Sequence, residues 1–157
     1  MKRVLSLIAA GAAAGVLSTA AMAAETWNMP TPYPDNNFHT VNIKQFADDV
    51  KAATGGALEI VVHANGALIK HPEIKNAVRG EQVPIGEFLL SRLSNENAAF
   101  EADSVPFLAA NYADAKRLWA ASRPQTETLL DAQGLMVLFS VPWPPQGIYA
   151  KKEINGV

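Results

Sequence analysis

Residues 26–62, TWNMPTPYPDNNFHTVNIKQFADDVKAATGGALEIVV, decide the fold class. Residues 26–31 and 58–62 read as short strands, and the second of them is a run of β-branched and apolar residues. Apolar residues between these two runs recur at helical spacing: Ile43, Phe46, Ala47, Val50 and Ala53. Asn37 suits the N-cap of that helix, and Gly55 stands where the helix ends. The stretch therefore predicts a β–α–β unit.

A second helix is predicted next, and it leads into a third strand. Pro72 suits the first turn of the helix, because its fixed φ matches helical geometry, and Gly80 ends the helix. The apolar residues that follow, from Val83 to Leu90, predict a strand. Pro84 has no N–H group to offer to a neighbouring strand, which favours an edge position or the start of the strand.

The remaining chain predicts two helices and two more strands. One helix begins near Tyr112, and Pro124 opens another that Gly134 ends. Residues 136–139 form an apolar run typical of a strand, and residues 148–150 begin another strand after a proline-rich loop. Because strands alternate with helices, we expect an α/β fold with a mostly parallel sheet and flanking helices.

The first 23 residues have the pattern of a secretory signal peptide. Lys2 and Arg3 form a basic start, an apolar stretch without charge follows, and an A-x-A cleavage pattern ends at Ala23. A membrane anchor is the alternative, but the apolar stretch is short for a span and rich in alanine and glycine. We therefore expect export to the periplasm and a folded part that comprises residues 24–157, about the size of one domain.

Composition narrows the classes of partner. The chain has a formal net charge of −2, and its signal region carries two of the basic residues, so a nucleic-acid partner is not expected. The chain contains no cysteine. An exported protein without cysteine has no disulfide framework and no thiol to oxidise.

No pattern of residues in the sequence indicates an enzyme or a metal site. Among the three histidines, none has another His or a Cys at metal-ligand spacing, and His39 and His71 are interpreted as surface residues near helix starts. The sequence shows neither a G-x-S-x-G turn nor a glycine-rich phosphate loop. Glu87 is a lone carboxylate and weak support for acid–base chemistry. We predict no catalytic residue, no metal ion and no cofactor.

The carboxyl ends of the predicted strands carry the most informative residues. In open α/β sheets ligands bind outside these ends. Residues 32–37, 87–92 and 143–146 offer aromatic surfaces, amides and prolines there. Proline fixes the backbone, so neighbouring side chains lose little entropy when a ligand binds. The alternative is structural: Trp143 packs under the sheet and the asparagines cap a helix.

In order and spacing the chain resembles the solute-binding proteins of TRAP transporters, of the DctP type. The likeness covers essentially all of residues 25–157. The stretches that carry it are TWNMPTPYPDNNFHT, NIKQFADDVKAATGGALEI, HANGALIKHPEIKNAVRGEQVPIGEFLLSRL, FEADSVPFL and GLMVLFSVPWPPQGIYAKKEI.

The resemblance implies a type II-like periplasmic binding protein with two α/β lobes that close on a small organic acid. It also implies delivery of the acid to TRAP permease subunits, and a monomer when the protein is complete. Ligand contacts from the first lobe match this sequence at seven positions: Tyr33, Asn36, Glu87, Leu89, Ser91, Trp143 and Gln146.

Two departures from the family pattern shape the expectation. Many members have an arginine near the position of Gln146, so a simple dicarboxylate ligand is in doubt. The chain also stops before the family's next arginine-bearing segment and before the second lobe. We therefore expect residues 24–157 to be an N-terminal lobe truncated in its return strand. The alternatives are a single-lobe module that binds another protein, a non-functional truncated product and a periplasmic enzyme.

Overall fold

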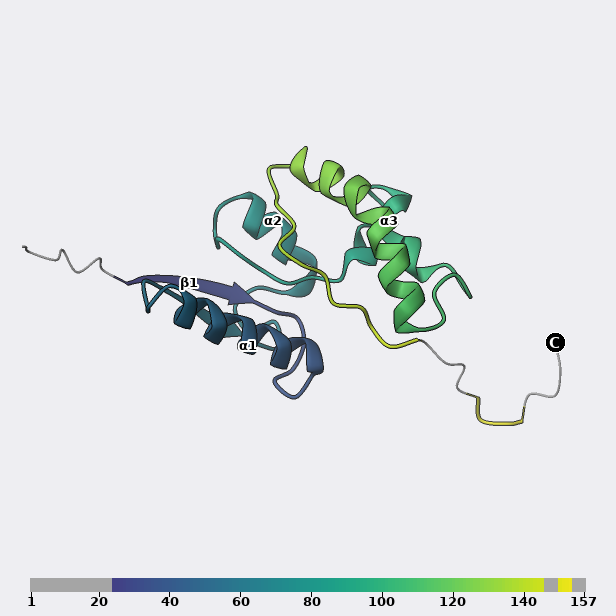
Figure 1. Ribbon diagram of the computed structural model, residues 1–157, viewed down its shortest axis with the longest axis horizontal. Coiled ribbons are helices and arrows are strands. Elements are labelled where there is room, and N and C mark those ends of the chain that lie inside the picture. The colour runs from purple at the N-terminus through teal and green to yellow at the C-terminus, as the bar shows by residue number, and fades with distance from the viewer. Residues whose placement is uncertain (1–23, 146–149, 154–157) are drawn as a thin grey trace, which may run out of the picture.

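The computed structural model describes residues 24–145 and 150–153 (Figure 1). It begins with strand β1 (Glu25–Pro30), helix α1 (Phe38–Ala53) and strand β2 (Leu58–His63). The two strands pair in parallel, with Glu25 opposite Leu58 and Pro30 opposite His63. The β–α–β unit predicted from the sequence is thus confirmed.

Both ends of α1 are fixed by local contacts. At the start, Asn37 Oδ1 accepts a hydrogen bond of 2.9 Å from the backbone N–H of His39. At the end, the Thr54 hydroxyl donates to the Val50 carbonyl oxygen at 2.8 Å. Gly55 follows with a φ of 60°, in the left-handed region that favours glycine. The predicted cap and the predicted stop are both confirmed.

A small apolar core holds α1 on the sheet. Its buried residues come from β1, α1, β2 and the segment after α2: Met29, Ile43, Ala47, Ile60 and Ile85. Ile43 and Ala47 lie one turn apart and therefore on the same helix face. Burying a side chain of the size of Ile contributes about 2 kcal/mol. The core therefore fixes both the helix and the segment around Ile85 relative to β1.

The predicted third strand is wrong. After the turn η1 (His71–Glu73) and helix α2 (Ile74–Arg79), the chain crosses the end of β1 in extended form but joins it through one backbone hydrogen bond, from Glu87 N–H to the Pro30 carbonyl at 3.0 Å. The segment instead packs on α2 at Gly86, where an added Cβ would lie 2.7 Å from Ile74 Cγ2. Within the described residues the sheet consists of β1 and β2.

A single helix, α3 (Tyr112–Asp131), stands where two helices were predicted around Pro124. An interior proline removes one hydrogen bond and crowds the preceding turn, which bends a helix. Figure 1 shows α3 changing direction along its length. The helix continues because Thr126 and Leu130 are buried on its inner side, and this burial offsets a cost of about 3 kcal/mol. None of the described helices is long and apolar enough to cross a membrane.

A second apolar core lies between α3 and two 3-10 turns, η2 (Leu90–Leu93) and η3 (Ala98–Ser104). Phe100 is 1% exposed and forms this core with Leu93, Leu130 and Leu135. The described residues therefore form two cores, one under α1 and one under α3, joined by α2 and the extended segment that follows it.

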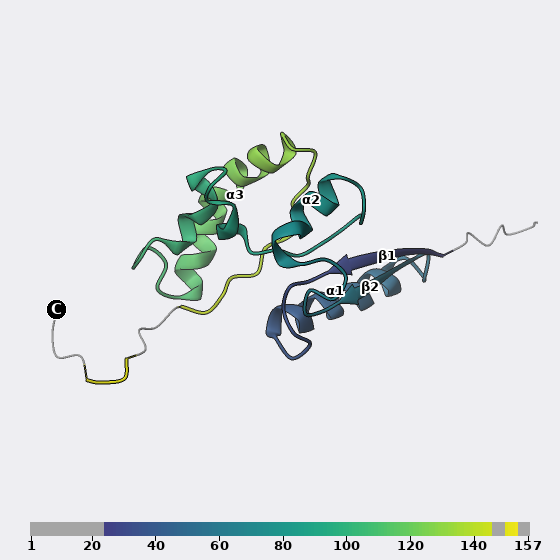
Figure 2. The ribbon, with the colours of Figure 1, turned by 180° about the vertical axis from the view of Figure 1, so that it is seen from behind.

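The chain returns from the second core toward α1 without forming the strand predicted at residues 136–139 (Figures 1 and 2). No described strand lies beside this run, so no ladder of hydrogen bonds forms. The contact with α1 is aromatic: the ring centroids of Phe139 and Phe46 are 5.0 Å apart. Most of the strand predicted at residues 148–150 lies outside the described residues.

Candidate ligand-binding site

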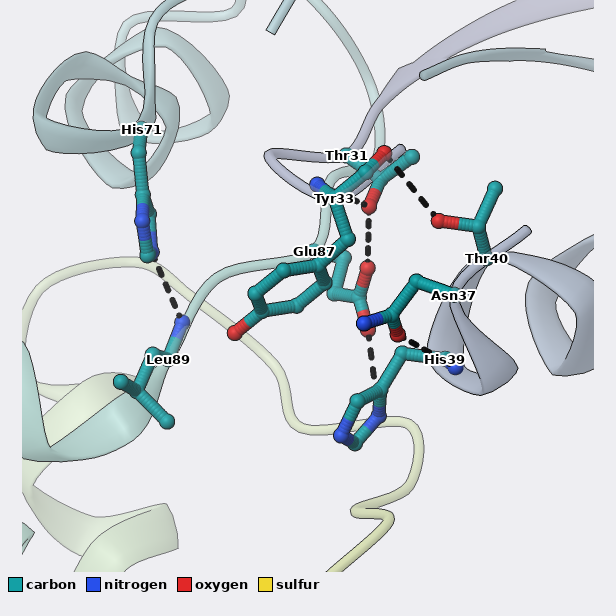
Figure 3. Close-up of polar contacts among 8 residues, drawn as sticks. All are labelled: Thr31, Tyr33, Asn37, His39, Thr40, His71, Glu87 and Leu89. Atoms are coloured by element: carbon teal, nitrogen blue, oxygen red, sulfur yellow. Dashed lines mark hydrogen bonds and ion pairs between the residues drawn. The ribbon is translucent and has the colours of Figure 1, made fainter. Parts of the chain in front are cut away.

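Three segments meet beyond the carboxyl end of β1. They are the loop of residues 31–37, the extended residues 84–89, and the return segment that carries Trp143. Figure 3 shows the polar contacts within and between the first two. This is the end of a parallel sheet at which α/β proteins bind ligands.

Glu87 is anchored to the end of β1. The hydroxyl of Thr31, which is fully buried, donates a hydrogen bond to Glu87 Oε2. The backbone N–H of Tyr33 in turn reaches Thr31 Oγ1 at 3.4 Å. The Glu87 side chain is 17% exposed. Burial raises the pKa of the Glu87 carboxyl, and the hydrogen bond from Thr31 opposes that rise.

His39 lies against Glu87 and is buried, so its interpretation as a surface residue is wrong. The residue is 4% exposed because the first turn of α1 faces the loop after β1 and the return segment. Nδ1 of His39 lies 3.7 Å from Glu87 Oε1, and burial lowers the pKa of the imidazole. Its other ring nitrogen, Nε2, is buried and has no hydrogen-bond partner among the described residues.

Four rings pack together here, and we call them the aromatic cluster: Tyr33, Phe38, His39 and Trp143. Tyr33 stacks on His39 with centroids 5.3 Å apart, and Trp143 lies 4.4 Å from His39 and 5.2 Å from Tyr33. Phe38 is the most open member, 42% exposed. Burial and the negative charge of Glu87 raise the pKa of Tyr33. Trp143 therefore contacts the rings of the site, and the core under α1 does not include it.

His71 closes another side of the site and is half-buried, so the surface interpretation is wrong here too. Its Nε2 accepts a hydrogen bond of 3.1 Å from the backbone N–H of Leu89 (Figure 3). A ring nitrogen that accepts carries no hydrogen, so this bond requires a neutral His71 with its proton on Nδ1. Burial and the positive charge of Arg92 lower the pKa of His71, which favours that state. The ring meets Tyr33 edge-on, with centroids 6.0 Å apart.

Four of the predicted site residues lie at this place. Tyr33, Glu87 and Trp143, which are far apart in the sequence, come together around His39. Leu89 lies at the edge of the group, where its backbone is held by His71.

The other three predicted residues are not part of these contacts. Asn36 is exposed on the loop before α1, and Ser91 is half-buried in η2. Gln146 lies outside the described residues. Their assignment as ligand contacts stays a prediction.

Four residues of the site were missed by the sequence analysis: Thr31, Phe38, His39 and His71. The sequence holds a signal for the first, because Thr31 is the last residue of a predicted strand. His39 and His71 gave no such signal, since their burial depends on segments far away in the chain.

The site suits non-covalent recognition of a small molecule. It offers ring faces, one partly buried carboxyl group and two imidazoles. A cavity of about 280 Å³ adjoins it, lined in part by His71, Phe88, Leu89 and Arg92. Among the described residues, no group of three or more His, Cys, Asp or Glu side chains is placed to hold a metal ion.

A family model described as bacterial extracellular solute-binding protein, family 7, matches residues 31–145. The match includes every residue of the aromatic cluster as well as Thr31, His71 and Glu87. Among curated proteins, no match is found.

Three solved structures are similar over most of the chain. DctP7 and DctP6 of Bordetella pertussis, extracytoplasmic solute receptors that bind pyroglutamic acid, are 51% and 47% identical to it. A TRAP solute-binding protein from a marine metagenome, specific for pyroglutamate, is 45% identical. Each has a TM-score of 0.80 over 82–83% of this chain.

The chain spans 43–44% of the length of these three proteins, which is less than half. A TRAP periplasmic solute-binding protein from Sulfitobacter with bound galacturonate has a TM-score of 0.61 at 18% identity. At that identity the likeness establishes a shared fold. The matched proteins are solute-binding receptors.

Proposed function

The chain belongs to the family of bacterial extracellular solute-binding proteins, family 7, and from this premise we propose that it forms part of a periplasmic receptor that captures a small organic acid. The observation that carries the proposal is the aromatic cluster packed around His39, whose Nδ1 lies 3.7 Å from Oε1 of the partly buried Glu87, at the carboxyl end of β1. Rigid rings beside a few fixed polar groups are typical of ligand pockets.

Pyroglutamate is the ligand we propose first, because the three receptors that are 45–51% identical to this chain over the matched part bind it. Its lactam ring is flat and carries a single carboxylate. A flat ring can lie against the rings of Tyr33 or Trp143, and its polar groups need partners such as Glu87. A single carboxylate also agrees with the glutamine at position 146, where many family members have an arginine.

Arg92 supplies positive charge at the edge of the proposed site. Its positive charge helps to lower the pKa of His71 and opposes the rise in the pKa of Tyr33, and Arg92 lines the adjoining cavity. A guanidinium group suits a carboxylate because it can donate two parallel hydrogen bonds. Arg92 is therefore a residue of the described part that we expect to attract the acid.

Delivery and location complete the proposal. We expect residues 1–23 to direct export to the periplasm and the complete protein to act as a monomer. A TRAP membrane permease would receive the acid from it. Support for this step comes from the receptors of TRAP systems that the chain resembles.

The test is calorimetric titration of the complete gene product, freed of bound ligand, with pyroglutamate. We expect saturable binding that Trp143→Ala weakens about 30-fold, because truncating a buried aromatic contact costs about 2 kcal/mol. Phe107→Ala is the matched control: this phenylalanine is 96% exposed and lies outside the aromatic cluster, so the affinity should not change.

Two results would contradict the proposal. One is the absence of binding to pyroglutamate and also to glutamate and galacturonate. The other is conversion of the ligand to a product, detected by mass spectrometry of the mixture after incubation, which would make the protein an enzyme.

A further inference from the structure

The hydrogen bond from Thr31 determines which oxygen of Glu87 can carry a proton. A threonine hydroxyl has one hydrogen, and that of Thr31 points at Glu87 Oε2. Oε2 is therefore an acceptor. Any proton bound to this carboxyl group sits on Oε1, the oxygen that lies 3.7 Å from Nδ1 of His39.

Burial makes an uncompensated negative charge on Glu87 costly. The titratable and charged groups that act on this region are His39 from α1, Tyr33 from the loop before it, His71 from η1 and Arg92 from η2. Among the described residues, the imidazole of His39 is the group that lies within ion-pair distance of the Glu87 carboxylate. With His39 neutral, an ionised Glu87 would be a buried charge without a cationic partner there.

One proton held between the two side chains removes this cost. It can sit on Glu87 Oε1, which leaves both groups neutral, or on His39 Nδ1, which makes an ion pair. The pair has the same number of protons and no net charge in either form. Burial raises the pKa of Glu87 and lowers that of His39, which favours the neutral form.

We propose that Glu87 and His39 hold one proton as a coupled pair, so that the site presents no net negative charge to an organic anion. His39 is the positioning residue that keeps this proton in place. The inference rests on the function proposed above. In both forms of the pair His39 Nε2 carries a hydrogen. Nε2 is the buried ring nitrogen that lacks a partner among the described residues. It is thus a hydrogen-bond donor, which is what an organic anion requires.

The proposal fixes the sign of a pH dependence. A small carboxylic acid such as pyroglutamate is ionised well above a pH of about 3.5. When the pair loses its proton at high pH, the Glu87 carboxylate repels the ligand and affinity falls. If one proton is required, the dissociation constant rises about tenfold per pH unit above the apparent pKa of the pair.

The experiment measures the pyroglutamate dissociation constant of the complete gene product from about pH 5 to pH 9, the range that spans imidazole titration. For the wild type we expect tight binding at low pH and the tenfold-per-unit loss above a break point. Glu87→Gln, which imitates the protonated carboxyl, should bind across the whole range without a break. His39→Gln should move the break to lower pH, because the proton loses its basic neighbour.

His63→Gln is the matched control, since this histidine lies on β2, where it pairs with Asn28, and its profile should be that of the wild type. A wild-type affinity that is flat over the range overturns the shared proton while the proposed function stands. If His39→Gln weakens binding equally at every pH and does not move the break point, the role proposed for His39 is wrong. Absence of binding at every pH overturns the proposed function itself, and the inference with it.

Discussion

The β1–α1–β2 unit and the unit built around α3 reach their folded structures by different routes. In the first, consecutive elements pack on each other, and side chains within a few residues cap both ends of the helix. In the second, Lys75 of α2 donates to Glu96 Oε1 at 2.5 Å and to Gln133 Oε1 at 2.8 Å, partners 21 and 58 residues away. Local contacts thus define one unit, and contacts between distant segments define the other.

The difference explains where the candidate site lies. Thr31, Tyr33 and His39 belong to the locally determined unit, which places the backbone that carries them. Glu87 comes from the segment that links the two units, and Trp143 from the segment that returns between them. The site therefore forms where both units are folded and correctly placed, as expected of a site that must be pre-formed to bind well.

Truncating Phe100 is expected to break the second unit most strongly. Phe100→Ala removes a side chain that is 1% exposed from a core of four buried residues, at a cost of about 3–5 kcal/mol. Urea denaturation of the complete gene product measures the loss. Hydrogen exchange should show lost protection in α3 and retained protection in β2, because the first unit keeps its own core.

Ile43→Ala is the matched change in the first core, with an expected cost of about 2–5 kcal/mol. Hydrogen exchange should then lose protection in α1 and β2 first. If both variants lose protection uniformly over the described residues, the two units unfold together and the comparison is wrong at the level of stability.

The sequence predicted the locally determined unit well and the other poorly, for the same physical reason. Periodicity and cap residues found β1, α1 and β2, because these elements depend on neighbours in the chain. The break predicted at Pro124 was wrong, since burial of Leu130 against a distant core continues the helix. The prediction of a strand at residues 136–139 was wrong, because no described partner strand lies beside this run.

The site shows the same division. Tyr33, Glu87 and Trp143 could be chosen from the sequence, because they lie at the ends of predicted strands and match ligand contacts of the family that the chain resembles. The strands predicted around Glu87 and before Trp143 do not form within the described residues, so the correctness of the choice did not depend on them. The burial of His39 could not, because Trp143, a residue of a distant segment, covers it. Pairs such as Thr31 and Glu87, 56 residues apart, carry no signal in one sequence.

Removing the amine of Lys75 tests the polar link of the second unit. Lys75 is 5% exposed, and Lys75→Met removes the two hydrogen bonds that its amine donates to the Glu96 carboxylate. Losing one partner of a buried pair costs about 3–5 kcal/mol, but Glu96 is partly exposed, so we expect about 2 kcal/mol. Lys44→Met breaks an exposed pair with Asp35 and should cost less than about 1 kcal/mol. Equal costs for the two variants in urea denaturation would refute the structural role of Lys75.

Removing the cap of α1 tests the local route of the first unit. Asn37→Ala leaves the N–H of His39 without its side-chain acceptor, so we expect a loss of about 1 kcal/mol. The neighbouring exposed Asn36 gives the control, because Asn36→Ala should leave stability within about 0.5 kcal/mol. Thermal unfolding of both variants compares them directly, and an equal effect would show that the cap contributes nothing specific.

The smallest effect that we expect is a loss of folding stability at acid pH that arises in the second unit. The hydrogen bond from Lys75 lowers the pKa of the Glu96 carboxyl below its usual 4.5. The folded protein then binds this proton less readily than the unfolded chain, so the stabilisation is complete above the unfolded-state pKa and is lost as pH falls through the folded-state value.

Wild type should therefore lose more stability between about pH 5 and pH 3 than Lys75→Met does, since Glu96 is no longer paired in the variant. The difference should be small, because water around the exposed part of Glu96 screens its charge. Identical acid titrations for wild type and Lys75→Met would mean that the link between α2 and the end of α3 acts through packing alone, and the second unit would then be held together in the same way as the first.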